Sequence, residues 1–261
     1  MERMKTILGA LVLVLFCPVF SWAEFDLWNA ENYNIELGGI YWRPNLDSTV
    51  KIVDNNIGTS INLVSDLGFE EKKGFGGAQL QIKFFDRNKL NFSYLPLKWD
   101  GDQVLTQTIQ FNGATYSVGT QVQSQLDMKL FKAGYEFDFI TGGYGFLGAT
   151  FDVMVTDVHI ELNAPAQAID EKHNAIVPIP MFGISGRLNF VKWMGLTARV
   201  SGLSAGGYGY VVDAEGSLDI NPVKYVGISG GYRYLRAQAT YQDNQADYKL
   251  DGPFVALKVR F

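Results

Sequence analysis

The feature that most constrains the fold of this chain is a set of segments in which polar and apolar residues alternate. Alternation with a period of two indicates β-strands that have one polar face and one apolar face. Ten such segments cover residues 33–42, 74–85, 89–99, 125–139, 143–158, 176–191, 195–204, 207–220, 225–240 and 248–261. No stretch beyond residue 23 is continuously apolar for the length of a membrane helix. The sequence therefore predicts an all-β protein, and the segment lengths suit tilted strands that cross a bilayer.

The connections between these segments alternate in length. Short connections cover residues 86–88, 140–142, 192–194 and 221–224, and long ones cover 43–73, 100–124 and 159–175. Short turns on one side and long loops on the other are typical of an up-and-down antiparallel transmembrane barrel. The connection Ala205-Gly206 would be a very short loop among the long ones. If it is a hairpin, the barrel has ten strands, and if it is not, eight strands is the main alternative.

The N-terminus has the pattern of a secretory signal peptide. Arg3 and Lys5 precede an apolar run over residues 7–16, and Ser21-Trp22-Ala23 offers small residues at the cleavage positions. We expect residues 1–23 to be removed after Sec-dependent export, leaving a single domain over residues 24–261. The one cysteine, Cys17, lies within the signal peptide. The mature domain therefore has no disulfide and must be held by its core or by a closed sheet.

Composition and charge exclude one class of partner. The chain has a net charge of −5, which argues against binding to nucleic acid. We also expect no cofactor, no metal site and no enzymatic activity.

The tryptophans beyond the predicted cleavage site all lie near strand ends. They are Trp28, Trp42, Trp99 and Trp193. Amphipathic rings prefer the headgroup level of a bilayer, so this placement predicts two aromatic girdles, with Trp42 and Trp99 in the one on the side of the long loops.

The charged residues within the strands define a polar face. A charge that faced lipid at the bilayer centre would cost roughly 2–4 kcal/mol for Lys or Arg, so these side chains are expected to line the lumen. The predicted acids are Glu36, Glu136, Asp138, Asp152, Asp213, Glu215 and Asp219, and the predicted bases are Lys83, Lys132, Arg187, Arg199, Arg233, Lys258 and Arg260. Seven acids and seven bases suit a network of ion pairs that fills and fastens the barrel. The alternative is a narrow, ion-selective pore.

Two of the long loops carry structural signals. Residues 60–69 are unusually apolar for a loop, which predicts either a plug that folds into the barrel mouth or a short hairpin extension. Asn112-Gly113 between alternating residues is a strong signal for a tight hairpin.

Both histidines, His159 and His173, lie in the third long loop. Asp157-Val158-His159, together with Asp100-Gly101-Asp102, resembles the acid and Asp–His pairs of the omptin proteases, which are ten-stranded barrels. The resemblance implies a water-activating histidine, and it rests on these two short motifs alone.

The final residues, Val255 to Phe261, place Val255, Leu257, Val259 and Phe261 on one face. A terminal aromatic residue that closes an alternating strand resembles the assembly signal of Gram-negative outer-membrane barrels. The motifs Leu67-Gly68-Phe69, Tyr94-Leu95-Pro96-Leu97, Phe111-Asn112-Gly113 and Gly134-Tyr135-Glu136-Phe137 resemble those of small porin-like barrels, of the kind grouped with OmpA and OmpW.

This resemblance implies an integral outer-membrane protein with both termini in the periplasm. Its expected partners are outer-membrane lipid, lipopolysaccharide, the barrel assembly machinery and small solutes. The function that it implies is passage of small solutes or a structural role in the envelope. A surface adhesin or receptor is the alternative.

Overall fold

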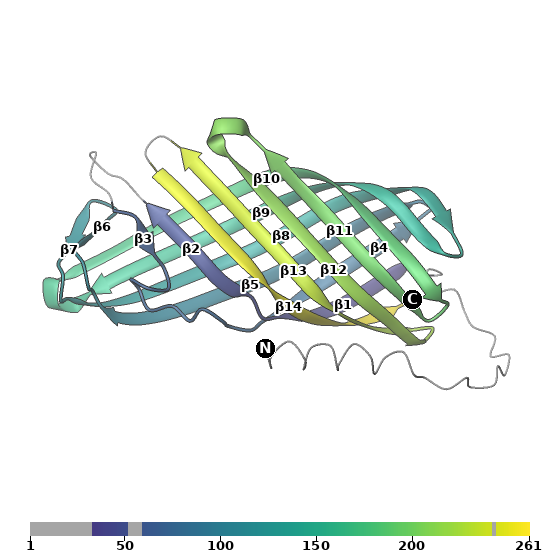
Figure 1. Ribbon diagram of the computed structural model, residues 1–261, viewed down its shortest axis with the longest axis horizontal. Helices are drawn as coiled ribbons and strands as arrows, with labels where there is room; N and C mark the ends of the chain where they lie inside the picture. Colours follow the sequence, from purple (N-terminus) through teal and green to yellow (C-terminus); the bar gives the residue numbers. More distant parts are fainter. Residues whose placement is uncertain (1–32, 52–58, 242–243) are drawn as a thin grey trace, which may run out of the picture.

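The computed structural model describes residues 33–51, 59–241 and 244–261, which form a closed antiparallel barrel (Figure 1). The predicted signal peptide and Trp28 lie outside the described residues. Ten strands make the barrel wall: β1 (Ile35–Trp42), β4 (Phe75–Phe84), β5 (Asn88–Val104), β8 (Gln121–Gly142), β9 (Gly145–Ala164), β10 (Ile169–Val191), β11 (Met194–Ser204), β12 (Gly209–Val223), β13 (Val226–Tyr241) and β14 (Asn244–Arg260). β14 pairs with β1 and closes the sheet. The predicted up-and-down barrel of ten strands is confirmed, and the alternative of eight is wrong.

The short connection that decided between these counts is a hairpin turn. A 3-10 helix, η2 (Gly206–Tyr208), joins β11 to β12, and the two strands pair from Ser204–Tyr210 down to Met194–Ile220. A second 3-10 helix, η1 (Pro165–Gln167), joins β9 to β10. No helix in the described part of the chain is long and apolar enough to cross a membrane.

Four further strands lie at the end of the barrel that carries the long loops. β2 (Asn45–Lys51) continues the line of β1 along β14, and β3 (Ile61–Asn62) pairs with β2. β6 (Ile109–Phe111) and β7 (Ala114–Tyr116) form a separate hairpin. The break between β1 and β2 falls at Pro44, which has no backbone N–H to donate to a sheet.

The barrel wall is uneven in height. β8, β9 and β10 contain 22, 20 and 23 residues, whereas β4 and β11 contain 10 and 11. β10 pairs with β9 from Ile169 to Leu188, but its described pairing with β11 begins only at Phe182. The edge of β10 from residue 169 to 181 therefore has no strand beside it on the β11 side among the described residues.

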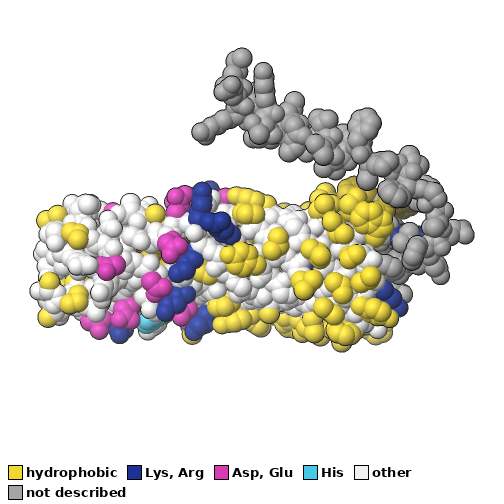
Figure 2. Space-filling view, turned by 90° about the horizontal axis from the view of Figure 1, so that it is seen from below, with side chains coloured by type: hydrophobic (Ala, Val, Ile, Leu, Met, Phe, Trp, Pro, Cys, Tyr) yellow, Lys and Arg dark blue, Asp and Glu magenta, His cyan; other side chains and the backbone are white. Residues whose placement is uncertain are grey.

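The outer surface divides the barrel into two halves. One half, here called proximal, contains Phe261 and carries a broad band of exposed apolar side chains (Figure 2). Exposed members of this band include Leu37, Phe131, Phe182, Leu218 and Leu257. The other half, called distal, contains β6 and β7 and has a polar surface. A belt of ion pairs separates the two, and such a change from apolar to charged surface marks the edge of a bilayer core.

The belt is made of salt bridges on the outer face of neighbouring strands. Its members are Lys98–Asp100 at 3.8 Å, Lys129–Asp157 at 3.9 Å, Arg236–Asp247 at 3.1 Å and Lys249–Asp251 at 3.1 Å.

The interior reverses this polarity. Along β8, the side chains that point inward are Lys132, Glu136 and Asp138 in the proximal half, and Val122, Leu126, Met128 and Leu130 in the distal half. The side chains of β8 that point outward are aromatic in the proximal half and polar in the distal half. They are Phe131, Tyr135 and Phe137 in the first, and Gln123, Gln125, Asp127 and Lys129 in the second. Even-numbered residues of β8 point inward from Val122 to Asp138, but these positions are mostly apolar up to Leu130 and mostly polar after it. The proximal half has an apolar outside and a polar inside, as a membrane barrel requires, and the distal half has a buried apolar core, as a water-exposed domain requires.

This reversal corrects the prediction for two tryptophans. Trp42 and Trp99 are fully buried inside the barrel and do not lie in an outer girdle. The indole N–H of Trp42 donates to the Gly252 carbonyl at 3.1 Å, and Trp99 packs edge-on against Phe75 with ring centroids 4.7 Å apart. Trp42 ends β1, whereas Trp99 lies within β5, and both belong to the buried apolar core, where burial inside the wall removes apolar area from water. Trp193, at the turn between β10 and β11, is 40% exposed.

Candidate functional site

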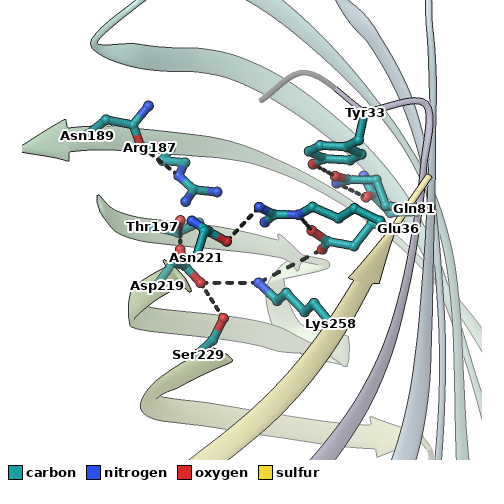
Figure 3. A network of polar contacts seen from close by, with 12 residues as sticks. Tyr33, Glu36, Gln81, Arg187, Asn189, Thr197, Asp219, Asn221, Ser229 and Lys258 are labelled. Atoms are coloured by element: carbon teal, nitrogen blue, oxygen red, sulfur yellow. Dashed lines mark hydrogen bonds and ion pairs between the residues drawn. The ribbon is translucent and has the colours of Figure 1, made fainter. Parts of the chain in front are cut away.

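The lumen of the proximal half holds a first group of charged residues close to the chain terminus, which we call the C-terminal cluster. Its members are Glu36, Asp219, Asn221, Lys258 and Arg260. Arg260 donates to Glu36 and to Asn221, both at 2.5 Å, and Lys258 lies 3.2 Å from Asp219 (Figure 3). Asp219 also accepts hydrogen bonds from Thr197 and Ser229. The cluster joins β1, β11, β12, β13 and β14 across the seam where the barrel closes.

A second group, the Glu136 cluster, joins β5, β8 and β11. Lys89 places its ammonium 2.9 Å from Glu136 and 2.8 Å from Asp138, and Arg199 donates to Glu136 at 2.7 Å. The Lys89 ammonium also lies over the ring of Phe146. Because a buried charge is expensive unless it is paired and hydrogen-bonded, this geometry favours a fastening role for the cluster.

Asp213 is the centre of a third group. Arg233 approaches it through Nε and Nη2, at 3.0 and 2.9 Å, and Lys132 adds a contact at 2.9 Å. The two-pronged geometry of Arg233 is the strongest form of ion pair in proteins. Lys132 comes from β8, Asp213 from β12 and Arg233 from β13, so these contacts span the lumen.

The remaining predicted lumen residues also lie on the inner face, in different settings. Arg187 donates to Asn189 at 2.9 Å, and Lys83 lies 5.9 Å from the ring of Tyr33. Glu215 lines the same polar cavity as Arg199. Asp152 is fully buried, and neither of its carboxylate oxygens has a hydrogen-bond partner among the described residues.

Sequence reasoning missed several members of this interior. Lys89 is fully buried at the centre of the Glu136 cluster, and Gln81 and Asn91 hydrogen-bond to each other at 2.6 Å. The signal was present, because Lys89, Asn91 and Ser93 alternate with Leu90, Phe92 and Tyr94. Among the described residues, no three His, Cys, Asp or Glu side chains gather as a set of metal ligands.

The space left in the polar lumen is small. A cavity of about 120 Å³ lies between the clusters, and Glu36, Gln79, Lys132, Glu136 and Arg233 are among the residues that line it. Such a volume holds a few water molecules. Arg233 forms the boundary with the apolar interior, because its guanidinium lies 5.2 Å from the ring of Trp42.

The apolar loop of residues 60–69 fills the interior beyond this boundary. Ile61, Leu63, Leu67 and Phe69 are buried in the same core as Trp42 and Trp99. The loop has a fixed turn, since Asn62 accepts from the N–H of Val64 at 3.0 Å. Ser124 on β8 holds it by donating to the Leu67 carbonyl at 3.1 Å. The prediction that this loop folds into the barrel mouth is confirmed.

The hairpin of β6 and β7 covers the distal end. Asn112 and Gly113 have φ angles of 50° and 83°, as a tight hairpin turn requires, so the Asn-Gly prediction is confirmed. Ile109, Phe111 and Tyr116 are buried beneath the hairpin. The Tyr116 hydroxyl donates to the Leu162 carbonyl at 3.0 Å, and burial raises the pKa of this phenol above its ordinary value.

The Asp and His residues that resemble an omptin site do not converge. Asp157 and His159 lie on the outer face of β9, where Asp157 contacts Lys129 at 3.9 Å and His159 contacts Asn174 and Glu161. Asp100 and Asp102 lie on β5, and β8 separates β5 from β9. Two strand spacings amount to about 10 Å, and both pairs are on a convex surface. His173 lies on β10, beside a second, apolar cavity.

The residues predicted to form an assembly signal lie on the outer face of β14 and at the residue that follows it. Val255, Leu257, Val259 and Phe261 are exposed within the apolar band, and Phe261 is 64% exposed. The Phe261 carbonyl accepts from the N–H groups of Asn34 and Ile35, at 2.8 and 3.1 Å. The last residue is thus fixed to the first strand of the barrel.

We compared this barrel with known protein families, curated proteins and solved structures. The chain matches no family profile and no curated protein. Among solved structures it is similar to the outer membrane protease OmpT from Escherichia coli, at a TM-score of 0.60 and 7% identity over 94% of this chain and 99% of that one. The translocator domain of the autotransporter NalP from Neisseria meningitidis matches at 0.43, with 10% identity over 100% of this chain and 95% of that one. Ail from Yersinia pestis matches at 0.36, with 8% identity over 87% and 99%.

The closed barrel, its apolar band and the likeness to OmpT together identify the fold class of this chain. The chain has the fold of a bacterial outer-membrane β-barrel, and the apolar band supports location in that membrane. At 7% identity the likeness to OmpT concerns the fold alone.

Proposed function

We propose that this protein is an integral outer-membrane barrel whose lumen is closed, and that it serves a structural role in the cell envelope. One observation carries the proposal: an apolar layer lies across the interior directly beyond the charged clusters. Trp42, Leu63, Leu67 and Trp99 belong to this layer.

An ion would have to leave the paired charges of the proximal half and enter this layer without water. Burying an unpaired charge costs far more than the few kcal/mol of a lost hydrogen bond. The charges themselves are engaged with one another, as in the contacts of Glu136 with Lys89 and Arg199. This pairing favours fastening of the wall over selection of solutes of one sign.

The orientation in the membrane is part of the proposal. The short turns and Phe261 lie at the proximal end, which we place toward the periplasm after Sec-dependent export. The exposed residues Val255, Leu257, Val259 and Phe261 would be the signal read by the barrel assembly machinery. Outer-membrane lipid would contact the apolar band, and lipopolysaccharide would meet the belt of ion pairs on the outer side.

Conductance in planar bilayers tests the closed lumen. The refolded protein is expected to give no stable single-channel steps. Deletion of residues 60–69, with a short Gly-Ser bridge in their place, removes the loop's share of the apolar layer, including Leu63 and Leu67, and is expected to give small, stable steps. Tyr208→Ala, at the exposed turn between β11 and β12, is the matched control and should stay silent.

Stable steps from the unaltered protein would overturn the proposal in favour of passage of small solutes. A silent deletion variant that retains the heat-modifiable mobility of a folded barrel would show that the loop is not what closes the lumen.

A further inference from the structure

The distal half contains an apolar cavity of about 280 Å³, separate from the polar lumen. The parts of β8, β9 and β10 that line it face the ends of β2, β13 and β14. Its walls include Leu126, Met128, Val158, Ile160, Ile179 and Ala246. The lining is almost entirely carbon, and Thr156, Ser48 and Tyr248 are its hydroxyl-bearing members.

The uneven height of the wall opens this cavity to the side. β11 and β12 are joined by the turn of η2, whereas β10 continues beyond its own last pair with β11, Phe182–Gly202. Along the unpaired edge of β10, Ile176 is 70% exposed and Val177 is 43% exposed. Val177 lines the cavity, so an apolar surface leads from the side of the barrel to its interior.

Strand register places the cavity along the barrel axis. At its proximal end Ile179 pairs with Met154 and Tyr248 pairs with Ser48. At its distal end His173 pairs with Ile160 and Lys51 pairs with Gln245. The ion pair Lys129–Asp157 of the belt lies between these levels on the outer face, since Asp157 pairs with Ile176. The cavity therefore begins near the bilayer edge and extends away from it.

The charged side chains in the described lining of the cavity are basic. Lys51 supplies an ammonium and His173 an imidazole, and no Asp or Glu is present among the described residues that line it. Both lie at the distal end. The site thus has an apolar floor toward the membrane and a basic rim toward water.

We propose that this cavity binds a free, single-chain anionic amphiphile, a fatty acid, with its carboxylate at Lys51 and His173 and its chain directed toward Tyr248 and Ile179. The volume is nearly twice the roughly 150 Å³ of a protein cavity that holds benzene, so one medium-length chain fits and a two-chain lipid does not. The direction of the site also favours a molecule that enters from water. The chain of a membrane lipid would enter through the side opening at Ile176 and Val177 and leave its headgroup at the belt, away from Lys51 and His173 at the distal end.

Photo-crosslinking tests the proposal with the full barrel in phosphatidylcholine vesicles. The probe is dodecanoate that carries a diazirine at the end of its chain, and labelled peptides are identified by mass spectrometry. Labels are expected near Thr156, Ile179 and Tyr248. Ala175→Trp, which fills the cavity from β10, should lower this labelling by about tenfold or more, a difference of about 1.4 kcal/mol. Ala149→Trp, on the lipid-facing side of β9, is the matched control and should leave it unchanged.

The basic rim has its own test. Replacing Lys51 and His173 by Gln should reduce labelling by dodecanoate roughly two- to fivefold, as expected for partly exposed charges. Labelling by dodecanol with the same diazirine should not change.

Equal labelling of the unaltered and Ala175→Trp proteins would overturn the proposal, and so would labels confined to the apolar band around Phe182 and Leu257. Labelling of the cavity by both probes with no effect of the rim substitutions would overturn the proposal of an anionic ligand, in favour of a site for uncharged apolar chains. These readouts are independent of conductance, so the cavity can be judged whether or not the lumen is closed.

Discussion

The guanidinium of Arg233 lies 5.2 Å from the ring centroid of Trp42 while it holds the carboxylate of Asp213 through two hydrogen bonds. This contact is where the charged interior of the proximal half meets the apolar interior of the distal half. Cation–π contacts of this kind are worth more when they are shielded from water, and both residues are buried. Arg233 therefore joins the two environments, through Asp213 on the polar side and Trp42 on the apolar side.

Trp42→Ala should destabilise the barrel strongly, because it leaves a cavity in the apolar layer and removes the ring beneath Arg233. We expect the free energy of unfolding to fall by about 3–5 kcal/mol. Urea unfolding, followed by heat-modifiable mobility, measures the change. Trp193→Ala at the exposed turn is the control and should change stability by roughly 0.5 kcal/mol. Equal effects of the two substitutions would contradict the assignment of Trp42 to a structural core.

Glu136→Gln should leave Lys89 and Arg199 buried without a full counter-charge. Breaking a buried ion pair from one side costs about 3–5 kcal/mol, and the same unfolding measurement should detect it. Glu161→Gln, which disturbs partly exposed contacts with Lys172 and His159, should cost about 1 kcal/mol or less. Adding Arg199→Met to Glu136→Gln should recover part of the loss, because the ion pair of Arg199 is with Glu136, whereas Lys89 must stay to pair with Asp138. A double variant less stable than the single one would argue against charge imbalance as the cause.

Removing Phe261 should impair assembly in cells, because the outward residues of β14 would lose their terminal aromatic ring. We expect less heat-modifiable, folded barrel in the outer-membrane fraction, and normal Arg260–Glu36 pairing in whatever folds. Phe85→Ala is the matched control, since Phe85 is an exposed aromatic residue at the same end of the barrel. Normal yield after loss of Phe261 would contradict its role as an assembly signal.

The hairpin of β6 and β7 should loosen at alkaline pH. Burial raises the pKa of Tyr116 above its ordinary value of 10.0, so the folded hairpin keeps the phenol neutral while the released hairpin can ionise. The stabilisation is fully present below pH 10.0 and is lost as the pH rises toward the folded pKa. A nitroxide label at exposed Thr106 should become more mobile over this range. Tyr116→Phe should abolish the pH dependence, and an identical profile in that variant would place its cause elsewhere.

The strand pattern could be predicted because its signals are local. Alternation over ten or more residues and turn residues such as Asn112-Gly113 specify strands and hairpins without knowledge of their neighbours. The same pattern placed Glu136, Asp213 and Arg233 together on an inner face. The pattern also contains the point at Leu130-Phe131 where the apolar residues of β8 change from the inner to the outer face. Sequence reasoning missed this change because it assigned one lipid-facing side to the whole of each strand.

The sequence by itself predicted an antiparallel barrel of ten or eight strands, the residues that share a face on each strand, and an unusually apolar loop at residues 60–69. The structure decided the strand count, because it shows that the short connection at Ala205-Gly206 is a hairpin. Only the tertiary structure decided where along each strand the apolar face turns from outside to inside. Alternation with a period of two predicts that Trp42 and Leu46 lie on the same face of the chain. It does not predict whether lipid, water or another strand lies against that face. That choice depends on the stagger of neighbouring strands and on the loop that fills the distal half. The opening beside β10 has the same origin, because it follows from strands that end at different heights.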